Sequence, residues 1–220
     1  MFKRSRTQDR GMDREIEAGN LEAVKQFLQD PKTNPNLRLS EKGFAPLNEA
    51  CYHGHLEIVK LLLNDPRVDI NNVDNNKGKT PFNIACEYGK TEIVKLFLHI
   101  ERVDINKPTK EDNRTPLFYA SVMGRTECVE YILASGRELD FTIKNQNGYS
   151  AIDIARKRRY PDIVKLLELF EKDPDRTRTE LRDKLGLLGI FFFLSLFFFS
   201  FLPFLFSLKI CPNLKLFISF

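Results

Sequence analysis

The sequence predicts an all-α solenoid of stacked helix-turn-helix units, followed by a hydrophobic C-terminal helix that we expect to span a membrane. Three observations predict this fold. Columns of similar residues recur at a constant step of 35, each unit carries two short helical patterns, and a 22-residue stretch near the C-terminus has no charge. Units of this kind must stack, because a single helical hairpin cannot bury its own apolar face.

The composition limits the classes of function that this chain can have. The 220 residues are 42% hydrophobic and 29% charged, which suits one folded domain with attachments. The net charge is +4, and its excess lies near the termini. The repeats are therefore close to neutral, so we expect no nucleic-acid partner. Residues 1–11 are expected to be a disordered N-terminus without an apolar leader, and the four widely spaced cysteines are expected to be free thiols.

The repeat is visible because several columns keep one register. The step connects Gly19, Gly54, Gly89 and Gly124, and it also connects Ala50, Ala85, Ala120 and Ala155. The predicted units are a degenerate N-capping unit 12–41, full units 42–76, 77–112 and 113–147, and a C-capping unit 148–186. The last unit has Arg159 where the others have the turn glycine.

The unit 77–112 illustrates the elements. Thr80 is predicted to cap the first helix, with Pro81 at the first helical position, where its missing N–H is not needed. Gly89 is predicted to end that helix in the left-handed conformation. A second helix follows over 91–98 with a wide apolar stripe, and 102–106 is expected to start an extended segment before an Asn-rich turn.

These motifs resemble the ankyrin repeat over about residues 12–170. They are Thr-Pro-Leu/Phe-x-x-Ala, Gly-x-x-Glu-Ile-Val-Lys-Leu-Leu-Leu and Val-Asp-Ile-Asn. Two departures matter. The period is 35 rather than the usual 33, with the extra length after the second helix, as at 64–67. The family's histidine after Thr-Pro-Leu is replaced by Asn48, Asn83, Phe118 and Asp153, so we expect its loop-bracing hydrogen bond to be altered or lost.

The resemblance implies a non-catalytic module that binds another protein on a concave face built from turn tips and first helices. The family's variable positions fall here on Phe44, Tyr52, His53, Lys79, Glu87, Tyr88, Arg114, Val122, Met123 and Tyr149. Tyr52, Tyr88 and Tyr149 are expected to be exposed anchors, because aromatic residues dominate interface energies. We expect no cofactor and no small-molecule substrate.

One short motif resembles the end of a phosphate-binding loop. Residues 78–80 read Gly-Lys-Thr, but the full pattern needs a glycine at position 73, which is Val73. Pro81 follows at once. The interpretation we favour is a turn.

A second cluster resembles the start of a zinc site. Cys51, His53 and His55 lie within five residues, but a fourth ligand at a compatible spacing is missing. The three histidines all occupy repeat positions, so the sequence offers no spare general base. We therefore predict neither a metal site nor an enzyme.

The segment Arg156-Lys157-Arg158-Arg159 is the one sharp basic cluster. Three interpretations stay open: a solvated face of the last repeat, a contact with anionic lipid headgroups, or a nuclear-import signal.

Residues 187–208 contain nine Phe and seven Leu and no charge. As a helix they would span ~33 Å, close to the ~30 Å hydrocarbon core of a bilayer. This predicts a transmembrane anchor followed by a short tail, 209–220. More Lys and Arg precede the segment than follow it, so the repeats of this single-pass protein are expected to face the cytosol.

A rival interpretation also stays open. Phe, Pro, and most Leu and Ser codons begin with two pyrimidines, so the segment could be a translated pyrimidine-rich tract and an artefact of the gene model. The protein would then be a soluble cytosolic ankyrin adaptor, or a fragment of a larger ankyrin-containing enzyme.

Overall fold

The computed structural model describes residues 11–38, 43–74 and 76–187. Residues 1–10 of the predicted disordered N-terminus, all but Leu187 of the predicted transmembrane segment, and the tail 209–220 lie outside these ranges. The described residues form helices and turns and contain no strand. None of the helices described combines the length and the apolar character that crossing a bilayer requires.

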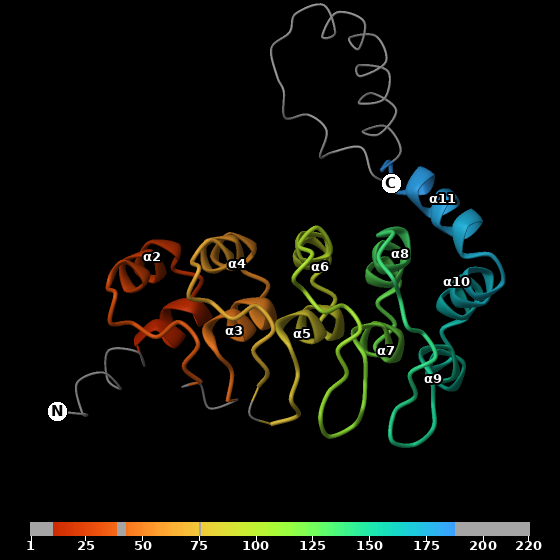
Figure 1. Cartoon of the computed structure of the whole chain (residues 1–220), viewed down its shortest axis with the longest axis horizontal. Coiled ribbons are helices and arrows are strands. Elements are labelled where there is room, and N and C mark those ends of the chain that lie inside the picture. The colour runs from red at the N-terminus through yellow and green to blue at the C-terminus, as the bar shows by residue number, and fades with distance from the viewer. Residues whose placement is uncertain (1–10, 39–42, 75, 188–220) are drawn as a thin grey trace, which may run out of the picture. The chain divides into compact units, whose positions relative to one another are not determined.

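Helical residues 11–17 precede a series of short helices. These are α2 (Leu21–Gln29), α3 (Pro46–His53), α4 (Leu56–Leu63), α5 (Pro81–Glu87), α6 (Thr91–Leu98), α7 (Pro116–Val122), α8 (Thr126–Ala134), α9 (Ala151–Arg158), α10 (Pro161–Lys172) and α11 (Pro174–Lys184). The chain divides into two compact units, 1–178 and 179–220, and the first holds the helices from α2 to α10. In that unit α3, α5, α7 and α9 form an inner row, and α2, α4, α6 and α8 form an outer row (Figure 1).

Local sequence signals set the helix ends as predicted. The Thr80 hydroxyl accepts a hydrogen bond from the main-chain amide of Asn83, and Pro81 is the first residue of α5. Gly89 has a φ of 66°, in the left-handed region. Arg159 takes the same turn position with a φ of 62°, so the last hairpin keeps its turn without a glycine.

The prediction of an extended segment at 102–106 was wrong. These residues form consecutive turns. The Val103 amide donates to the Ile100 carbonyl, and the Asn106 amide donates to the Asp104 carboxylate at 3.1 Å. An aspartate that bonds the backbone two residues on holds a turn rather than a strand.

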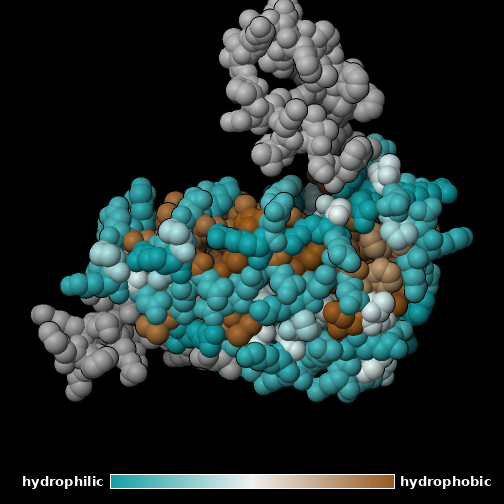
Figure 2. Space-filling view, in the orientation of Figure 1, coloured by the Kyte–Doolittle hydropathy of each residue, from teal (hydrophilic) through white to brown (hydrophobic). Residues whose placement is uncertain are grey.

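The core lies between the two helix rows. The small side chains of Ala50, Ala85 and Ala120 on the inner helices are fully buried, as are Val59, Val94 and Val129 on the outer helices. Small residues let the two rows approach, and each larger aliphatic side chain buried there contributes about 1.5–3 kcal/mol. Figure 2 shows hydrophobic residues gathered in the band between the rows, with hydrophilic residues over most of the remaining surface.

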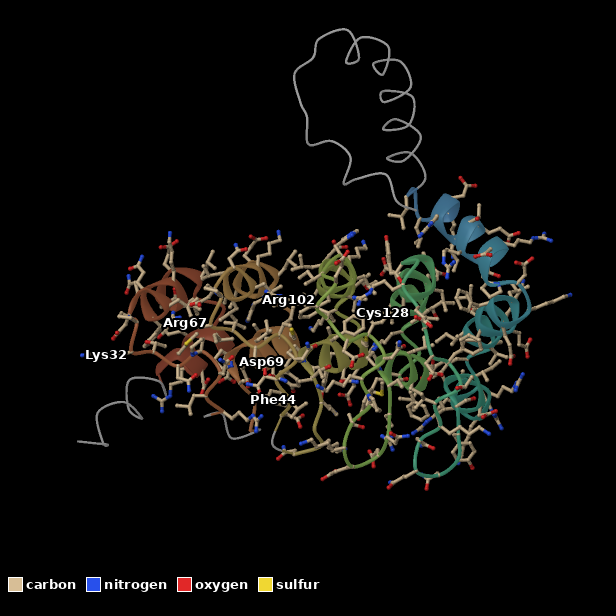
Figure 3. All side chains as sticks on the ribbon, in the orientation of Figure 1. Lys32, Phe44, Arg67, Asp69, Arg102 and Cys128 are labelled. Carbon is tan, nitrogen blue, oxygen red and sulfur yellow. The ribbon has the colours of Figure 1, made fainter. Side chains whose placement is uncertain are left out.

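An arginine column follows the outer helices, in the stretch that carries the extra length of the repeat. The Arg67 guanidinium donates to the carbonyl oxygens of Leu28 and Thr33 at 2.7 and 3.2 Å, one unit back. Arg102 and Arg137 repeat this contact at the next two junctions (Figure 3 labels Arg67 and Arg102). Leu28 and Leu63 lie in the last turns of α2 and α4, where carbonyls lack partners within the helix, so Arg67 and Arg102 satisfy them. Arg137 instead donates to carbonyls of the turn that follows α6, and all three arginines join consecutive units.

A second ladder fixes the turns between inner and outer helices. The residue after each turn glycine lies over the turn of the preceding unit. The Lys90 ammonium donates to the His53 carbonyl at 3.3 Å, and the Arg125 guanidinium donates to the Glu87 carbonyl at 3.2 Å. This ladder holds the C-terminal ends of the inner helices in line.

Candidate functional site

The ends of the inner helices and the bases of the preceding loops form a continuous set of positions that we name the inner strip. It consists of three columns with a step of 35: Phe44, Lys79, Arg114 and Tyr149; Tyr52, Glu87, Val122 and Lys157; and His53, Tyr88, Met123 and Arg158. All ten residues predicted to contact a partner lie on these columns. The columns add Lys157 and Arg158.

The first two columns pair within a unit at a spacing of eight residues. The Phe44 and Tyr52 ring centroids lie 5.7 Å apart. The Lys157 ammonium lies 3.2 Å from the Tyr149 hydroxyl and 4.4 Å from its ring centroid. The same pairing in the second full unit is an ion pair between Lys79 and Glu87, described below. In these three units the loop base is therefore held against the end of the inner helix.

The ion pair of the second full unit is largely buried. Lys79 Nζ lies 2.5 Å from Glu87 Oε2, and the two side chains are only 10% and 15% exposed. The ammonium also lies 5.0 Å from the Tyr119 ring centroid, and burial raises the pKa of the Tyr119 hydroxyl to about 12. The opposite charges of Lys79 and Glu87 neutralise each other, so this part of the inner strip carries no net charge.

The third full unit departs from the pairing. Arg114 lies 3.4 Å from the Asp112 carboxylate and 5.6 Å from the Phe118 ring centroid. Val122, at the paired position, is half-buried. The guanidinium thus contacts Asp112 in the same loop and Phe118 of α7, and it leaves Val122 as an apolar position of the strip.

Exposure separates the supporting residues of the strip from the accessible ones. Phe44 and Lys79 are each 8% exposed and support their neighbours, whereas Tyr88 and Met123 are 37% and 41% exposed. Tyr52 and Tyr149 are half-buried, so the expectation that all three anchor tyrosines are exposed was wrong for these two. The cause is the packing of their rings against Phe44 and Lys157.

Two tyrosines join across a unit boundary. The Tyr52 and Tyr88 rings meet edge to face with centroids 4.6 Å apart. His53 stands edge-on to Tyr52 at 4.9 Å, and its Nε2 lies 3.0 Å from Glu49 Oε1. Phe44, Tyr52, His53 and Tyr88 therefore form one aromatic cluster over α3 and α5.

The Gly-Lys-Thr motif is a turn. The main-chain amides of Lys77, Gly78 and Lys79 all donate to one oxygen of the Asp74 carboxylate, at 2.8, 2.8 and 3.2 Å. These amides would have to face a phosphate in a nucleotide-binding loop. Here an internal carboxylate takes that place.

Cys51, His53 and His55 contact different groups and do not converge on one point. The Cys51 thiol is fully buried, and burial raises its pKa well above the usual range. His53 contacts Glu49, and His55 Nε2 lies 3.3 Å from the Glu17 carbonyl oxygen of the preceding unit. Within the described ranges no three His, Cys, Asp or Glu side chains gather as a metal-binding group.

The loop-bracing column keeps its hydrogen bond where asparagine replaces histidine. The Asn48 side-chain amide donates to the Asn72 carbonyl oxygen at 3.4 Å, and the Asn83 side-chain amide donates to the equivalent Lys107 carbonyl oxygen at 3.4 Å. Phe118 cannot make this bond and is buried at 2% exposure. The loop-bracing hydrogen bond is therefore present in the two units with asparagine and lost in the unit with Phe118.

Lys157 and Arg158 were not among the predicted contact residues. They were read only as part of the basic cluster 156–159, because a run of charges in one helix suggests a solvated face. The signal that could have placed them was available, since they stand 35 residues after Val122 and Met123. Both side chains are exposed at the end of α9.

Comparison with known families supports the repeat fold. A family model described as ankyrin repeats (3 copies) matches residues 14–109 and 97–178. Among curated proteins, no sequence matches the chain at a significant level.

Proposed function

This chain belongs to the ankyrin-repeat family, and on that premise we propose that it is a non-catalytic protein-binding module whose inner strip holds a protein partner. Ankyrin repeats act as protein-protein interaction modules, and their stacked units create extended binding surfaces. The match covers the whole repeat region, from α2 to the start of α11.

The contact between Tyr52 and Tyr88 carries the proposal. Tyr88 keeps 37% of its surface exposed although it packs against Tyr52, and Met123 is exposed at the same position of the next unit. Aromatic residues and methionine are enriched where proteins bind one another. Tyrosine buries a large apolar area at a low cost in side-chain entropy, and the flexible methionine side chain adapts to varied partners. The aromatic cluster is therefore the proposed anchor point.

A selection from displayed random 16-residue peptides against the full chain in mild detergent tests this proposal. Selected peptides are expected to bind Tyr52→Ala/Tyr88→Ala at least about tenfold more weakly. Leu169→Ala removes a similarly exposed apolar side chain from α10 and is expected to leave binding unchanged. The single variant Tyr88→Ala keeps the test available if the double variant melts early. If a Tyr88 variant that remains folded binds the peptides as strongly as the wild type does, the aromatic cluster is not the anchor.

We also propose that residues 187–208 tether the repeats to a membrane, with the repeats in the cytosol. The support is the uncharged sequence and the distribution of Lys and Arg around it. Sequencing the transcript across the codons for Gly186 and Leu187, followed by carbonate extraction of the expressed chain, tests the proposal. A continuous message with the protein in the membrane pellet is expected. A splice at this point, or recovery in the supernatant, favours the untethered adaptor instead.

A further inference from the structure

We infer that the inner strip binds an extended protein segment that is apolar at its end over α3 and α5 and acidic at its end over α9. The inference rests on the proposed function and adds the chemistry and the direction of the partner. It follows from how charge is distributed along the three columns.

The length of the segment follows from the helix packing. In the inner row α3 packs on α5, α5 on α7, and α7 on α9. Neighbouring packed helices lie about 10 Å apart, so three steps span about 30 Å. An extended chain advances about 3.3 Å per residue and covers this span with roughly nine or ten residues.

The half of the strip over α3 and α5 offers apolar contacts, and the Lys79 ammonium there is already paired with Glu87. Tyr52 and Tyr88 provide ring surface there, while Glu49 contacts His53 and Glu87 pairs with Lys79. Val122 and the exposed Met123 continue the apolar surface over α7. A methionine side chain adapts to varied partners, so this half fits aliphatic or aromatic residues.

The half over α9 is cationic. Arg156 is matched by Glu168 at 2.6 Å and by Asp153 at 3.9 Å. Lys157 contacts only the neutral Tyr149 ring and hydroxyl, and in the part of the chain that the structure describes no carboxylate pairs with Lys157, Arg158 or Arg159. These three exposed cations therefore favour carboxylates in the partner.

The positions of the cations favour a protein segment over a lipid headgroup. Lys157 and Arg158 do not form a separate patch, because they stand in the same columns as Val122 and Met123. A ligand that spans these columns meets apolar side chains first and cations next. A peptide with both chemistries satisfies the whole strip, whereas a headgroup would satisfy the cations alone.

The test uses the displayed 16-residue peptides selected against the full chain. Glu and Asp are expected to be enriched at one end of the selected peptides and Leu, Phe or Tyr at the other. Lys157→Glu/Arg158→Glu is expected to bind them about tenfold more weakly, because each lost attraction becomes a repulsion. The control Lys25→Glu/Lys165→Glu makes the same change in net charge on α2 and α10 and is expected to leave binding within about twofold.

The outcomes separate this inference from the proposed function. Peptides that need Tyr88 but show no acidic end, and that bind the Lys157 and Arg158 variant normally, overturn the inference and leave the proposed function standing. Peptides that bind all variants equally overturn both. Phosphatidylserine vesicles are the third probe: if the Lys157 and Arg158 variant loses vesicle binding but keeps peptide binding, the cations serve a lipid surface and the inference is wrong.

Discussion

Arg137 donates from Nη2 to the main-chain carbonyl oxygen of Val103 at 2.7 Å, one unit back along the chain. The same guanidinium reaches the carbonyl oxygens of Ile100 and Glu101 at 3.1 and 3.0 Å. A planar fork of donors suits a cluster of carbonyl groups, and an ammonium group in its place would lack this geometry. The residues that lengthen the repeat thus supply a clamp between consecutive units.

Arg137→Ala should lower the free energy of unfolding by about 1–3 kcal/mol, because three carbonyl groups lose a charged donor. Arg102 is the matched control, since it stands in the same column but donates to one carbonyl, that of Leu63, at 3.4 Å. Arg102→Ala should cost less than about 1 kcal/mol. Urea unfolding of both variants measures the difference. Equal losses would show that the carbonyl contacts do not join the units.

Gly124→Ala should destabilise the chain more than Gly148→Ala. Both glycines have a positive φ, of 67° and 78°, so alanine costs about 1–2 kcal/mol at either position. A Cβ at Gly124 would also lie 2.6 Å from the Tyr160 ring, whereas a Cβ at Gly148 meets no atom within 4 Å. The added overlap should cost a further ~1–3 kcal/mol.

The double variant Gly124→Ala/Tyr160→Ala isolates that overlap. Removing the ring should recover the steric part of the loss, so the two substitutions should couple in a double-mutant cycle of unfolding free energies. If the losses in unfolding free energy are additive, the residue at position 124 does not contact the Tyr160 ring.

Asp153→Asn should make stability less sensitive to acid. Hydrogen bonds from the Ser150 amide and hydroxyl lower the pKa of the Asp153 carboxyl. A lowered folded-state pKa stabilises the fold above the ordinary pKa of about 3.9, and this stabilisation is lost as the pH falls through the folded-state pKa. Asn83 makes the equivalent cap in α5 with a neutral amide, so the variant should still fold.

Unfolding free energies measured from pH 7 to pH 3 check this prediction. The wild type should lose more stability than Asp153→Asn over the acidic part of that range. Parallel curves would show that the Ser150 contacts do not depend on the charge of Asp153.

Local signals made much of the fold predictable. Thr80, Pro81 and Gly89 act on their own backbone neighbours, so their residue types alone indicate the helix ends. The arginine column was visible at the step of 35, but its partners are carbonyl oxygens 34–39 residues away, which carry no residue-type signal. The clamp could therefore not be predicted.

The repeat register predicted which positions belong to the candidate site, but it did not predict which of their side chains are exposed. The register placed Phe44 and Tyr88 on the same face, whereas their burial depends on which neighbour fills the adjoining space. Tyr52 lies beside Phe44 and helps to cover it, whereas Tyr88 also contacts Tyr52 but stays 37% exposed. Only the assembled stack of units reveals this difference.

The thiols of Cys51, Cys86 and Cys128 should resist modification in the folded chain. All three are buried, and burial raises the pKa of each thiol, which disfavours the reactive thiolate. A Cys211→Ser variant leaves these as the only cysteines. Titration with a disulfide reagent at pH 8 should detect almost no thiol before denaturant is added and three afterwards. Rapid reaction of the folded variant would contradict the packing of α3, α5 and α8, which carry these cysteines.

Amide hydrogen exchange of the full chain, with and without a selected peptide, tests the central claim most directly. The account predicts added protection at the ends of α3, α5, α7 and α9 and at the turns that follow them, with little change along α4, α6 and α8. Protection confined to the outer helices would place the partner on the opposite face and contradict the assignment of the inner strip.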